Sequence, residues 1–402
     1  MGILSGAFQR RAELNESTAS GLIEALRNQG SLGGSVAGIP VTADSALSVA
    51  TVFACVRALA ESTAMLPLIL YRRDGRNKAR ATDHPLYALL HDAPNDEMTS
   101  VQLIEALMTN VVLWGNGCAR LVIDNTGQVR EMWPLLSRYL TIERADGELI
   151  YKYHAPDLRQ TFRRWEIYHV PGLTLNGIAG LSVLGYMRRA VGMGLVLDTF
   201  GEKFYENGAR PGVVLEHPAR LGPEAAKTLR ESWEERYGGV SNVNKPAVLE
   251  EGMKVNTFGM PMEDAQFLQS RKFQGEEIAR MFRLPPHMVG ILDHATFTNI
   301  EHQGAEFVTY SLGPWLNRIA RRVALDLLLT GDRRDYFAEF LTAALLRGDI
   351  QARASAYGAA IRDGWMTRNQ VRESENMNID DPALDQYLVP LNMSTAGAAN
   401  EQ

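Results

Sequence analysis

Residues 262–321 read MEDAQFLQSRKFQGEEIARMFRLPPHMVGILDHATFTNIEHQGAEFVTYSLGPWLNRIAR, and this stretch decides the fold. A polar helix that Asp264 can cap ends at the double proline 285–286, since the residue before a proline is pushed out of the helical region. The segment 290–301 is too polar for a core and lies between two helices, the second of which restarts near His302. Long helix, polar loop, long helix is an order that presents a flexible element on rigid supports. It indicates a structural machine more than a catalytic pocket.

Length and composition limit the possible classes of protein. The chain has 402 residues, enough for two or more domains, with 46% hydrophobic and 22% charged residues, as in an ordinary soluble protein. Its net charge is −6 and its sequence pI about 5.8, so it does not resemble a basic nucleic-acid clamp. Cys55 and Cys118 are far apart in the sequence, and we expect both to be reduced and buried, as in a cytosolic protein.

We expect no targeting segment and no membrane association. The start, MGILSGAFQRRAEL, lacks the apolar run of a signal peptide. The most apolar helix, 181–200, carries Arg188 and Arg189 in its middle, which excludes a membrane span.

The first half of the chain predicts an α+β body. Residues 1–45 are rich in Gly, Ser and Ala and predict a flexible arm, with Asp44 or Ser45 as the cap of the first helix. Further helices are expected at 84–95 and at Ser100–Trp114. A strand is expected at LILYRR (68–73), and CARLVID, VREMW, YLTIER, LIYKYH and WEIYHV predict an antiparallel sheet between 117 and 170.

A small α/β insertion is expected between two long helices. The first helix runs from about Ser182, which we interpret as its N-cap, to Tyr205, and its several glycines indicate close packing against a neighbour. The insertion would contain strands PGVVLE, AVLE and MKVNTF around a helix from Pro223 to Tyr237. The second long helix is the one described above.

The C-terminal part is expected to be helical. The segments are DYFAEFLTAALLRG, IQARASAYGAAIRDG and a short helix opened by Thr367 and Gln370 at capping-box spacing. Pro314 is a candidate kink in the helix that precedes them. STAGAANEQ at the end predicts a disordered tail.

Motifs of enzymes are mostly missing. There is no GxxxxGK[ST] phosphate loop, and Gly180–Gly185 misses the nucleophile-elbow spacing by one residue. One cluster has metal-type side chains, namely Asp293, His294, Glu301 and His302, but its spacing matches no helical zinc motif. We therefore predict no catalytic residue, no metal and no cofactor. An enzyme of unknown class using loop 293–302 is one alternative, and a multidomain scaffold that does not contact DNA is another.

A series of segments, which follow one another in the same order along nearly the whole chain, resembles those of tailed-bacteriophage portal proteins, the head–tail connector family. The resemblance rests on SVATVFACVRALAESTAMLPLILYRR, HPLYALLHDAPN, LMTNVVLWGNGCARLVIDNTGQVREMWPL, EIYHVPGLTLNGIAGLSVL, NGARPGVVLE, QFLQSRKFQGEEIARMFRLPPHMVG, NIEHQGAEFVTYSLGPWLNRIARRV and LLRGDIQARASAYGAAIRDGWMTRNQVRESENM. No one of these motifs is catalytic, so the specificity comes from their agreement in order.

The resemblance implies a portal-type α+β fold assembled as a ring, with the twelve subunits typical of the family. Its parts would be a flexible N-terminal arm 1–45, a wing 46–180, stem helices 181–208 and 262–284, a clip 209–261, a tunnel loop 285–301, a long helix 302–330 joining wing and crown, a crown 331–390 and a disordered tail 391–402. The implied partners are double-stranded DNA in the channel, the large terminase ATPase, head–tail connector proteins, and major capsid and scaffold proteins. The implied location is the virion, with assembly in the host cytoplasm.

Two sets of site residues follow from that resemblance. The tunnel loop would place polar side chains without Lys or Arg beside DNA: Asp293, His294, Thr296, Thr298 and Asn299. The clip helix would pack through Ala226, Leu229 and Trp233 and direct four residues outward for terminase or connector docking: Glu224, Arg230, Glu231 and Glu234. A solvated helix face is the alternative for this second set.

Overall fold

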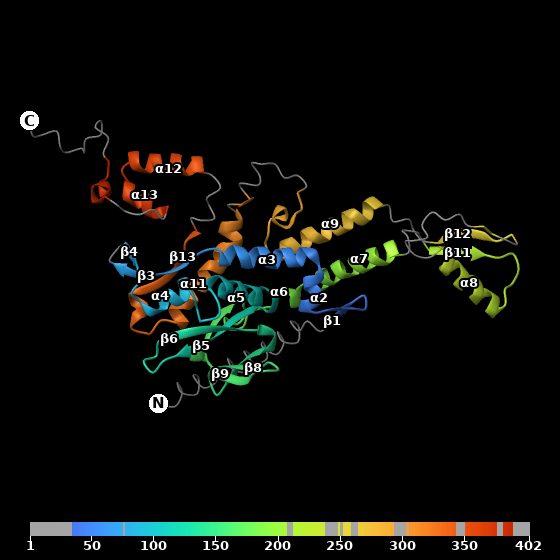
Figure 1. The fold of residues 1–402 in the computed structure, drawn as a ribbon, viewed down its shortest axis with the longest axis horizontal. Coiled ribbons are helices and arrows are strands. Elements are labelled where there is room, and N and C mark those ends of the chain that lie inside the picture. The colour runs from blue at the N-terminus through green and yellow to red at the C-terminus, as the bar shows by residue number, and fades with distance from the viewer. Residues whose placement is uncertain are drawn as a thin grey trace, which may run out of the picture.

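The computed structural model describes residues 34–74, 77–206, 212–237, 248–249, 252–258, 264–292, 303–304, 306–342, 350–375 and 381–388. The predicted mixture of helices and antiparallel strands is confirmed (Figure 1). A body of helices and small sheets is joined by two long helices to a distal unit. The two helices are α7 (Arg188–Glu206) and α9 (Asp264–Met281), and the distal unit is made of β11 (Gly212–Glu216), α8 (Pro223–Tyr237) and β12 (Lys254–Phe258). We call α7 and α9 the helix pair. Among the described residues, no helix has the length and hydropathy needed to cross a membrane.

The body is built on two helices that pack together, α3 (Ala50–Ala64) and α5 (Ser100–Trp114). The Thr99 side chain accepts from the Gln102 amide and the Gln102 side chain accepts from the Thr99 amide, so a capping box starts α5 at the predicted residue. Gly115, at φ 83°, ends it. Between them lies the short α4 (Pro85–His91), also predicted, with His84 as its N-cap.

The strands between 116 and 171 form two sheets, so the single sheet predicted there is wrong. The first sheet has the order β10 (Ile167–Pro171), β5 (Asn116–Ile123), β6 (Val129–Leu135). The second has the order β7 (Leu140–Ala145), β8 (Glu148–His154), β9 (Arg159–Arg163). The chain leaves the first sheet through a 3₁₀ turn at Ser137–Tyr139, and a small separate core that includes Tyr151, Phe162 and Cys118 fills the space between the sheets. The strands therefore form two packed sheets instead of the single sheet expected, because this second apolar cluster is buried between them.

The segment beginning DYFAEF is a strand, which corrects the helix predicted there. β13 (Tyr336–Phe340) pairs antiparallel with β3 (Leu68–Asp74), and β4 (Asn77–Arg80) pairs on the other side of β3. Ala338 and Phe340 are buried, and the Phe337 ring stacks on Tyr71 at 5.7 Å on the opposite face. Pairing with an otherwise open strand edge, more than 250 residues away in sequence, overrides the local helical preference.

A hairpin occupies residues that were expected to belong to the flexible arm 1–45. β1 (Gly34–Val36) pairs with β2 (Ile39–Val41) across Ala37 and Gly38, which both have positive φ, 50° and 83°. Two positive φ values in a two-residue loop match the twist of a hairpin. The hairpin packs on α7. Residues 1–33 of the predicted arm lie outside the described residues.

Helix starts next to the hairpin and the helix pair are set by side-chain caps. α2 (Ala43–Ser48) is capped by Thr42 in a capping box with Ser45, two or three residues before the predicted cap at Asp44 or Ser45. The Ser182 hydroxyl accepts from the Gly185 amide at the start of α6 (Val183–Tyr186), so its prediction as an N-cap is confirmed. The helix predicted from Ser182 to Tyr205 is interrupted at Met187, and α7 (Arg188–Glu206) follows.

The helix pair leads out of the body to the distal unit (Figure 1). α7 lies beside α9 (Asp264–Met281), and the distal unit pairs β11 (Gly212–Glu216) antiparallel with β12 (Lys254–Phe258), with α8 (Pro223–Tyr237) between them in sequence. The helix at Pro223–Tyr237 and the strands PGVVLE and MKVNTF are confirmed. The predicted strand AVLE has only Val248 and Leu249 inside the described residues, and neither is in a strand.

Pro314 changes the helix that returns to the body. A π-helix (Phe307–Leu312) precedes α11 (Gly313–Asp326), because Pro314 has no amide hydrogen for a regular helical bond and lies in the first turn of α11. Past β13 come α12 (Ile350–Arg362) and α13 (Arg368–Ser374), and the capping box of Thr367 and Gln370 is confirmed. The predicted tail 391–402 lies outside the described residues.

Candidate functional site

The residues predicted for docking lie together on α8. Glu224, Arg230, Glu231 and Glu234 are all exposed. Ala226, Leu229 and Trp233 are half-buried on the other face, and the Trp233 ring lies 4.6 Å from that of Tyr237. No residue of α8 is buried. The helix therefore carries an acidic outer face and a thin apolar inner face, and this arrangement is compatible with docking and with a solvated surface alike.

The residues predicted to meet DNA, Asp293, His294, Thr296, Thr298 and Asn299, lie outside the described residues. The same holds for Glu301 and His302 of the metal-type cluster. Across the part of the chain that the structure describes, no group of three His, Cys, Asp or Glu side chains could hold a metal.

The described residues on either side of 293–302 are in contact. α9 ends at Met281, Arg283 adopts φ 57°, and a 3₁₀ turn at Pro286–Val289 is closed by Gly290 at φ 85°. The ring of His287 lies 2.7 Å from Gln303 Oε1. The helix thus ends at Met281, short of the end predicted at residue 284, because the chain already turns at Arg283 ahead of the double proline. A side-chain contact brings residues 287 and 303 together.

Polar contacts hold the helix pair in register. The Arg271 guanidinium donates to Asp198 at 2.6 Å, and the Gln274 side chain donates to the Ala190 carbonyl at 2.7 Å. Beyond these contacts, toward the distal unit, Phe267 and Phe200 lie with ring centroids 5.7 Å apart. The pair is therefore a defined unit within one chain.

The glycines of α7 serve contacts within the chain. A Cβ on Gly192 would lie 2.5 Å from Val36 in the hairpin, and a Cβ on Gly201 would lie 3.2 Å from the Phe267 ring of α9. A Cβ on Gly194 would lie 3.3 Å from Val49. The close packing predicted from these glycines is thus found, and the neighbour is the same subunit.

Large apolar side chains remain exposed along the helix pair. Met193 and Phe200 of α7 are 47% and 45% exposed, and Leu268 and Phe273 of α9 are 64% and 59% exposed. Isolated exposed apolar residues are common. These four show that the helix pair leaves large apolar side chains exposed in the single chain.

A buried polar network fastens α11 to the body. Asp326, whose side chain is fully buried, accepts from Arg322 at 2.8 Å, from Arg164, and from the backbone amide of His169 at 3.1 Å. The Tyr168 hydroxyl donates to the Ile319 carbonyl at 2.9 Å. Two arginines thus neutralise one buried carboxylate between a helix and a sheet.

His169 of β10 is a neutral member of this network. Its Nε2 lies 2.9 Å from Asn116 Oδ1 and its Nδ1 lies 3.1 Å from the Tyr151 hydroxyl. Burial, together with the charges of Arg322 and Arg164, holds the pKa of His169 well below its usual range. Its prediction as a structural residue agrees with these contacts.

Both cysteines are buried and free, as predicted. Burial raises the pKa of the Cys55 thiol to about 12 and raises that of Cys118 as well. Neither has the exposed, low-pKa character of a reactive thiol.

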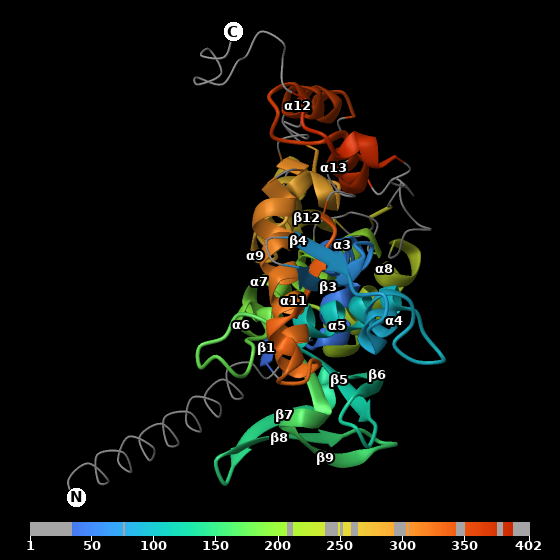
Figure 2. The same ribbon diagram turned by 90° about the vertical axis from the view of Figure 1, so that its left-hand side faces the viewer.

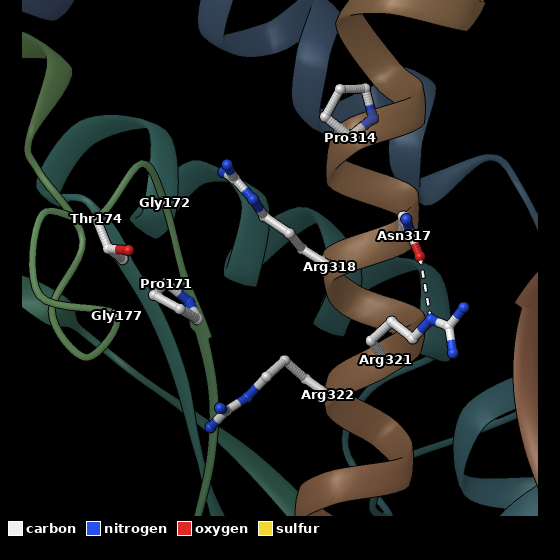
Figure 3. Close-up of a pocket in the computed structure, with 9 residues that line it drawn as sticks. All are labelled: Pro171, Gly172, Thr174, Gly177, Pro314, Asn317, Arg318, Arg321 and Arg322. Atoms are coloured by element: carbon white, nitrogen blue, oxygen red, sulfur yellow. Dashed lines mark hydrogen bonds between the residues drawn. The ribbon is translucent and has the colours of Figure 1, made fainter.

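Sequence reasoning missed a pocket of about 460 Å³ between α11 and the loop that follows β10 (Figure 3). Figure 3 shows Arg318 and Arg322 reaching from α11 toward the loop, while Arg321 is directed toward Asn317 at the other edge. The remaining lining residues are Pro171, Gly172, Thr174, Gly177 and Pro314. The spacing of the three arginines at i, i+3 and i+4 on one helix could have been recognised in the sequence as a cluster of positive charge. The loop that forms the opposite wall of the pocket lies beside these arginines only in the folded chain.

Comparison with known proteins gives consistent matches. The family model described as phage portal protein matches residues 50–376. The chain is 31% identical to the probable portal protein of Streptomyces phage phiC31, over 90% of this chain and 82% of the relative. It is 30% identical to the portal protein of Enterobacteria phage HK97, over 87% and 85% respectively. Its fold is similar to that of a chain in the neck of a native gene transfer agent particle computed with C12 symmetry, with a TM-score of 0.58 and 22% identity, covering 89% of this chain and 94% of the other.

Proposed function

This chain belongs to the phage portal protein family, and from that premise we propose that copies of it form a closed ring at one vertex of a capsid. Double-stranded DNA would enter through the ring during packaging and leave through it at ejection, and the ring would serve as the docking platform for the tail. Portal proteins are structural components of the virion, and we propose that this chain carries no catalytic activity of its own.

The observation that carries the ring proposal is the apolar surface of the helix pair. Met193, Phe200, Leu268 and Phe273 expose large side chains in the single chain, although the two helices are otherwise held in register by their own contacts. A neighbouring copy would remove these side chains from water. In a ring this contact would be head-to-tail, with one side of the helix pair meeting a different side of the next copy's pair, and it closes when the rotation fits. Twelve copies are proposed, in line with the C12 symmetry of the gene transfer agent neck.

Electron microscopy of the purified protein in negative stain tests this directly. We expect rings with a central hole wide enough for duplex DNA, and a mass from light scattering equal to twelve chains. A homogeneous monomer at micromolar concentration across several salt concentrations, also in the presence of its capsid and scaffold proteins, would overturn the proposal.

Within this ring we assign the parts of the chain as follows. The body up to residue 180 would be the wing, the helix pair the stem, residues 209–261 with the distal unit the clip, and 331–390 the crown. β13 lies in this last range but pairs with β3, so the boundary between crown and wing would fall after Phe340. The range 302–330, which contains α11, would link wing and crown.

We propose that the segment 285–301 faces the channel and that Asp293, His294, Thr296, Thr298 and Asn299 touch DNA transiently. The sequence there has no Lys or Arg, and the whole chain has a net charge of −6, so the channel would let a polyanion slide instead of binding it. Introducing two lysines within 293–299 should slow DNA passage without preventing ring assembly. The slowing should weaken as salt is raised, because it would arise from phosphate attraction.

The packaging energy would come from a separate large terminase ATPase, since the sequence lacks a phosphate-binding loop. We propose that α8 supplies the docking surface for the terminase or for head–tail connector proteins, through Glu224, Arg230, Glu231 and Glu234. Capsid and scaffold proteins would contact the ring during assembly in the host cytoplasm.

A further inference from the structure

The arginine pocket on α11 and an acidic turn of the body form a matched pair of surfaces. We propose that Arg318 in the pocket and Arg321 at its outer edge receive the turn 92–97 of the neighbouring copy, so that Asp96 and Glu97 pair with these arginines across every subunit boundary. This inference rests on the proposed ring and names a contact that holds its wings together.

The pocket offers cations that its own chain does not neutralise. Arg322 is paired with Asp326, but no ion pair to a described residue is found for Arg318 or Arg321. Arg318 is half-buried and lies 5.0 Å from the centre of the Trp315 ring, and burial lowers its pKa. A partly desolvated guanidinium without a carboxylate favours an incoming anion.

The wall opposite the arginines is rigid. The Gly172 amide donates to the Gly115 carbonyl at 2.7 Å, and a Cβ on Gly180 would lie 1.7 Å from that same carbonyl oxygen. Asn116 Oδ1 accepts from the Gly180 amide at 2.8 Å. These contacts fix the loop 172–180 against the corner of α5 and β5.

The same loop presents an apolar rim beside the pocket. Leu173 and Leu175 are 64% and 62% exposed, although the Leu173 carbonyl accepts from the Leu181 amide at 2.7 Å. Two leucines held outward on a fixed loop would pack on the chain that enters the pocket.

The acidic turn is equally rigid. The buried Asn95 donates from its side-chain amide to the Met132 carbonyl at 2.8 Å, and its Oδ1 accepts from the amides of Glu97 and Met98 at 2.9 and 3.0 Å. Asp96 and Glu97 are exposed and have no described ion pair, whereas Asp92 contacts His91 at 2.7 Å. Val101, close by in sequence at the start of α5, is 48% exposed and offers an apolar contact next to the two carboxylates.

The two surfaces lie on opposite sides of the body. Figure 2 shows the loop next to α6 projecting on one side and the turn after α4 projecting on the other. A contact between two different faces of one chain is head-to-tail and suits a closed ring. Charge complementarity would set its register.

Charge reversal tests the pair. We expect Arg318→Glu with Arg321→Glu, and separately Asp96→Arg with Glu97→Arg, each to weaken subunit association by about 100-fold at low salt, because each places like charges together. The control Glu148→Arg with Asp157→Arg changes the charge by the same amount as the acidic-turn variant elsewhere on the body, where both side chains are exposed, and should leave rings intact. Circular dichroism should show that all variants keep the wild-type melting temperature within a few degrees.

Mixing the two defective variants gives the decisive measurement. In an alternating ring every pocket that carries glutamates meets a turn that carries arginines, and every unchanged pocket meets an unchanged turn. Rings should therefore reappear in the mixture, as seen by light scattering and negative stain, and also in a single chain that carries all four substitutions.

The outcomes separate this inference from the ring proposal. Wild-type chains that form no ring would overturn the proposed function and this contact with it. Wild-type rings that persist in both charge-reversed variants, or defects that mixing does not repair, would overturn the contact alone. Loss of DNA retention in the arginine variant with intact rings would assign the pocket to phosphate instead.

Discussion

Helices α5 and α8 are both fifteen residues long, yet they depend on different partners. α5 buries most of its length, including Leu107, Met108 and Val111, whereas no residue of α8 is buried. α5 begins at a capping box, ends at Gly115, and packs in a hydrophobic core to which elements from the whole body contribute. α8 belongs to a distal unit joined to the body through the helix pair (Figure 1). The body therefore holds its own fold, while the distal unit and the helix pair keep surface available for other chains.

The largest expected effect is a loss of folding stability in the body. Gly180→Ala would place a Cβ 1.7 Å from the Gly115 carbonyl oxygen, a backbone atom that cannot move without displacing the corner of α5 and β5. We expect the free energy of unfolding to fall by about 3 kcal/mol or more, measured by urea denaturation.

A matched glycine serves as the control for that change. Gly358 lies inside α12, and a Cβ added there would meet no described atom within 4 Å apart from its sequence neighbours and the nearby helix backbone, so Gly358→Ala should stabilise the chain by about 0.5–1 kcal/mol. Equal losses from both substitutions would contradict the view that the Gly115–Gly180 approach fixes the loop.

The next effect separates folding from assembly. Leu268→Glu with Phe273→Glu puts charge on the exposed apolar surface of α9, where the two side chains are 64% and 59% exposed. We expect the monomer's melting temperature to change little, whereas rings should be lost, with association weakened on the order of 100-fold as measured by light scattering. Rings of normal mass in this variant would show that the helix pair does not form the subunit contact.

A smaller effect is confined to the distal unit. Reversing Glu231 and Glu234 to Lys alters the outer face of α8, where both side chains are exposed. Rings should form normally, because no residue of α8 is buried, while DNA packaging in a reconstituted reaction should fall by about tenfold or more. The same reversal at Glu148 on the body is the control, and normal packaging by the α8 variant would assign this face to solvent.

Many of the helix boundaries in the body and in the distal unit could be predicted from local sequence signals. The limits of α5 and α8, the cap at Ser182 and the capping box at Thr367 follow from side chains that act within one helical turn. The order of the segments also sufficed for the family. Local signals were enough wherever the partner of a residue is its sequence neighbour.

The features that sequence reasoning missed depend on distant partners or unusual backbone. β13 is a strand because it pairs with the free edge of β3, and the residues Tyr336–Phe340 alone do not indicate that pairing. The β1–β2 hairpin turns at Ala37 with φ 50°, a conformation that alanine rarely adopts. The arginine pocket exists only because three glycines, Gly115, Gly172 and Gly180, allow a loop from another part of the chain to approach the corner beside α11.

The smallest expected effect is a pH dependence that belongs to the body. Because the pKa of the buried His169 is held well below its unfolded value near 6.5, the unfolded chain binds a proton that the folded chain does not. Stability is therefore fully present above about pH 6.5 and declines as pH falls below it, by at most about 1.4 kcal/mol per pH unit from this one group. The melting temperature of the wild type should fall more between pH 6.5 and 5.5 than that of His169→Gln, which should begin lower but vary less. His154, exposed at the end of β8, provides the control, because His154→Gln should retain the full wild-type slope. If the His169 and His154 variants show equal slopes, the pH response of the body comes from other groups and the neutral state assigned to His169 is wrong.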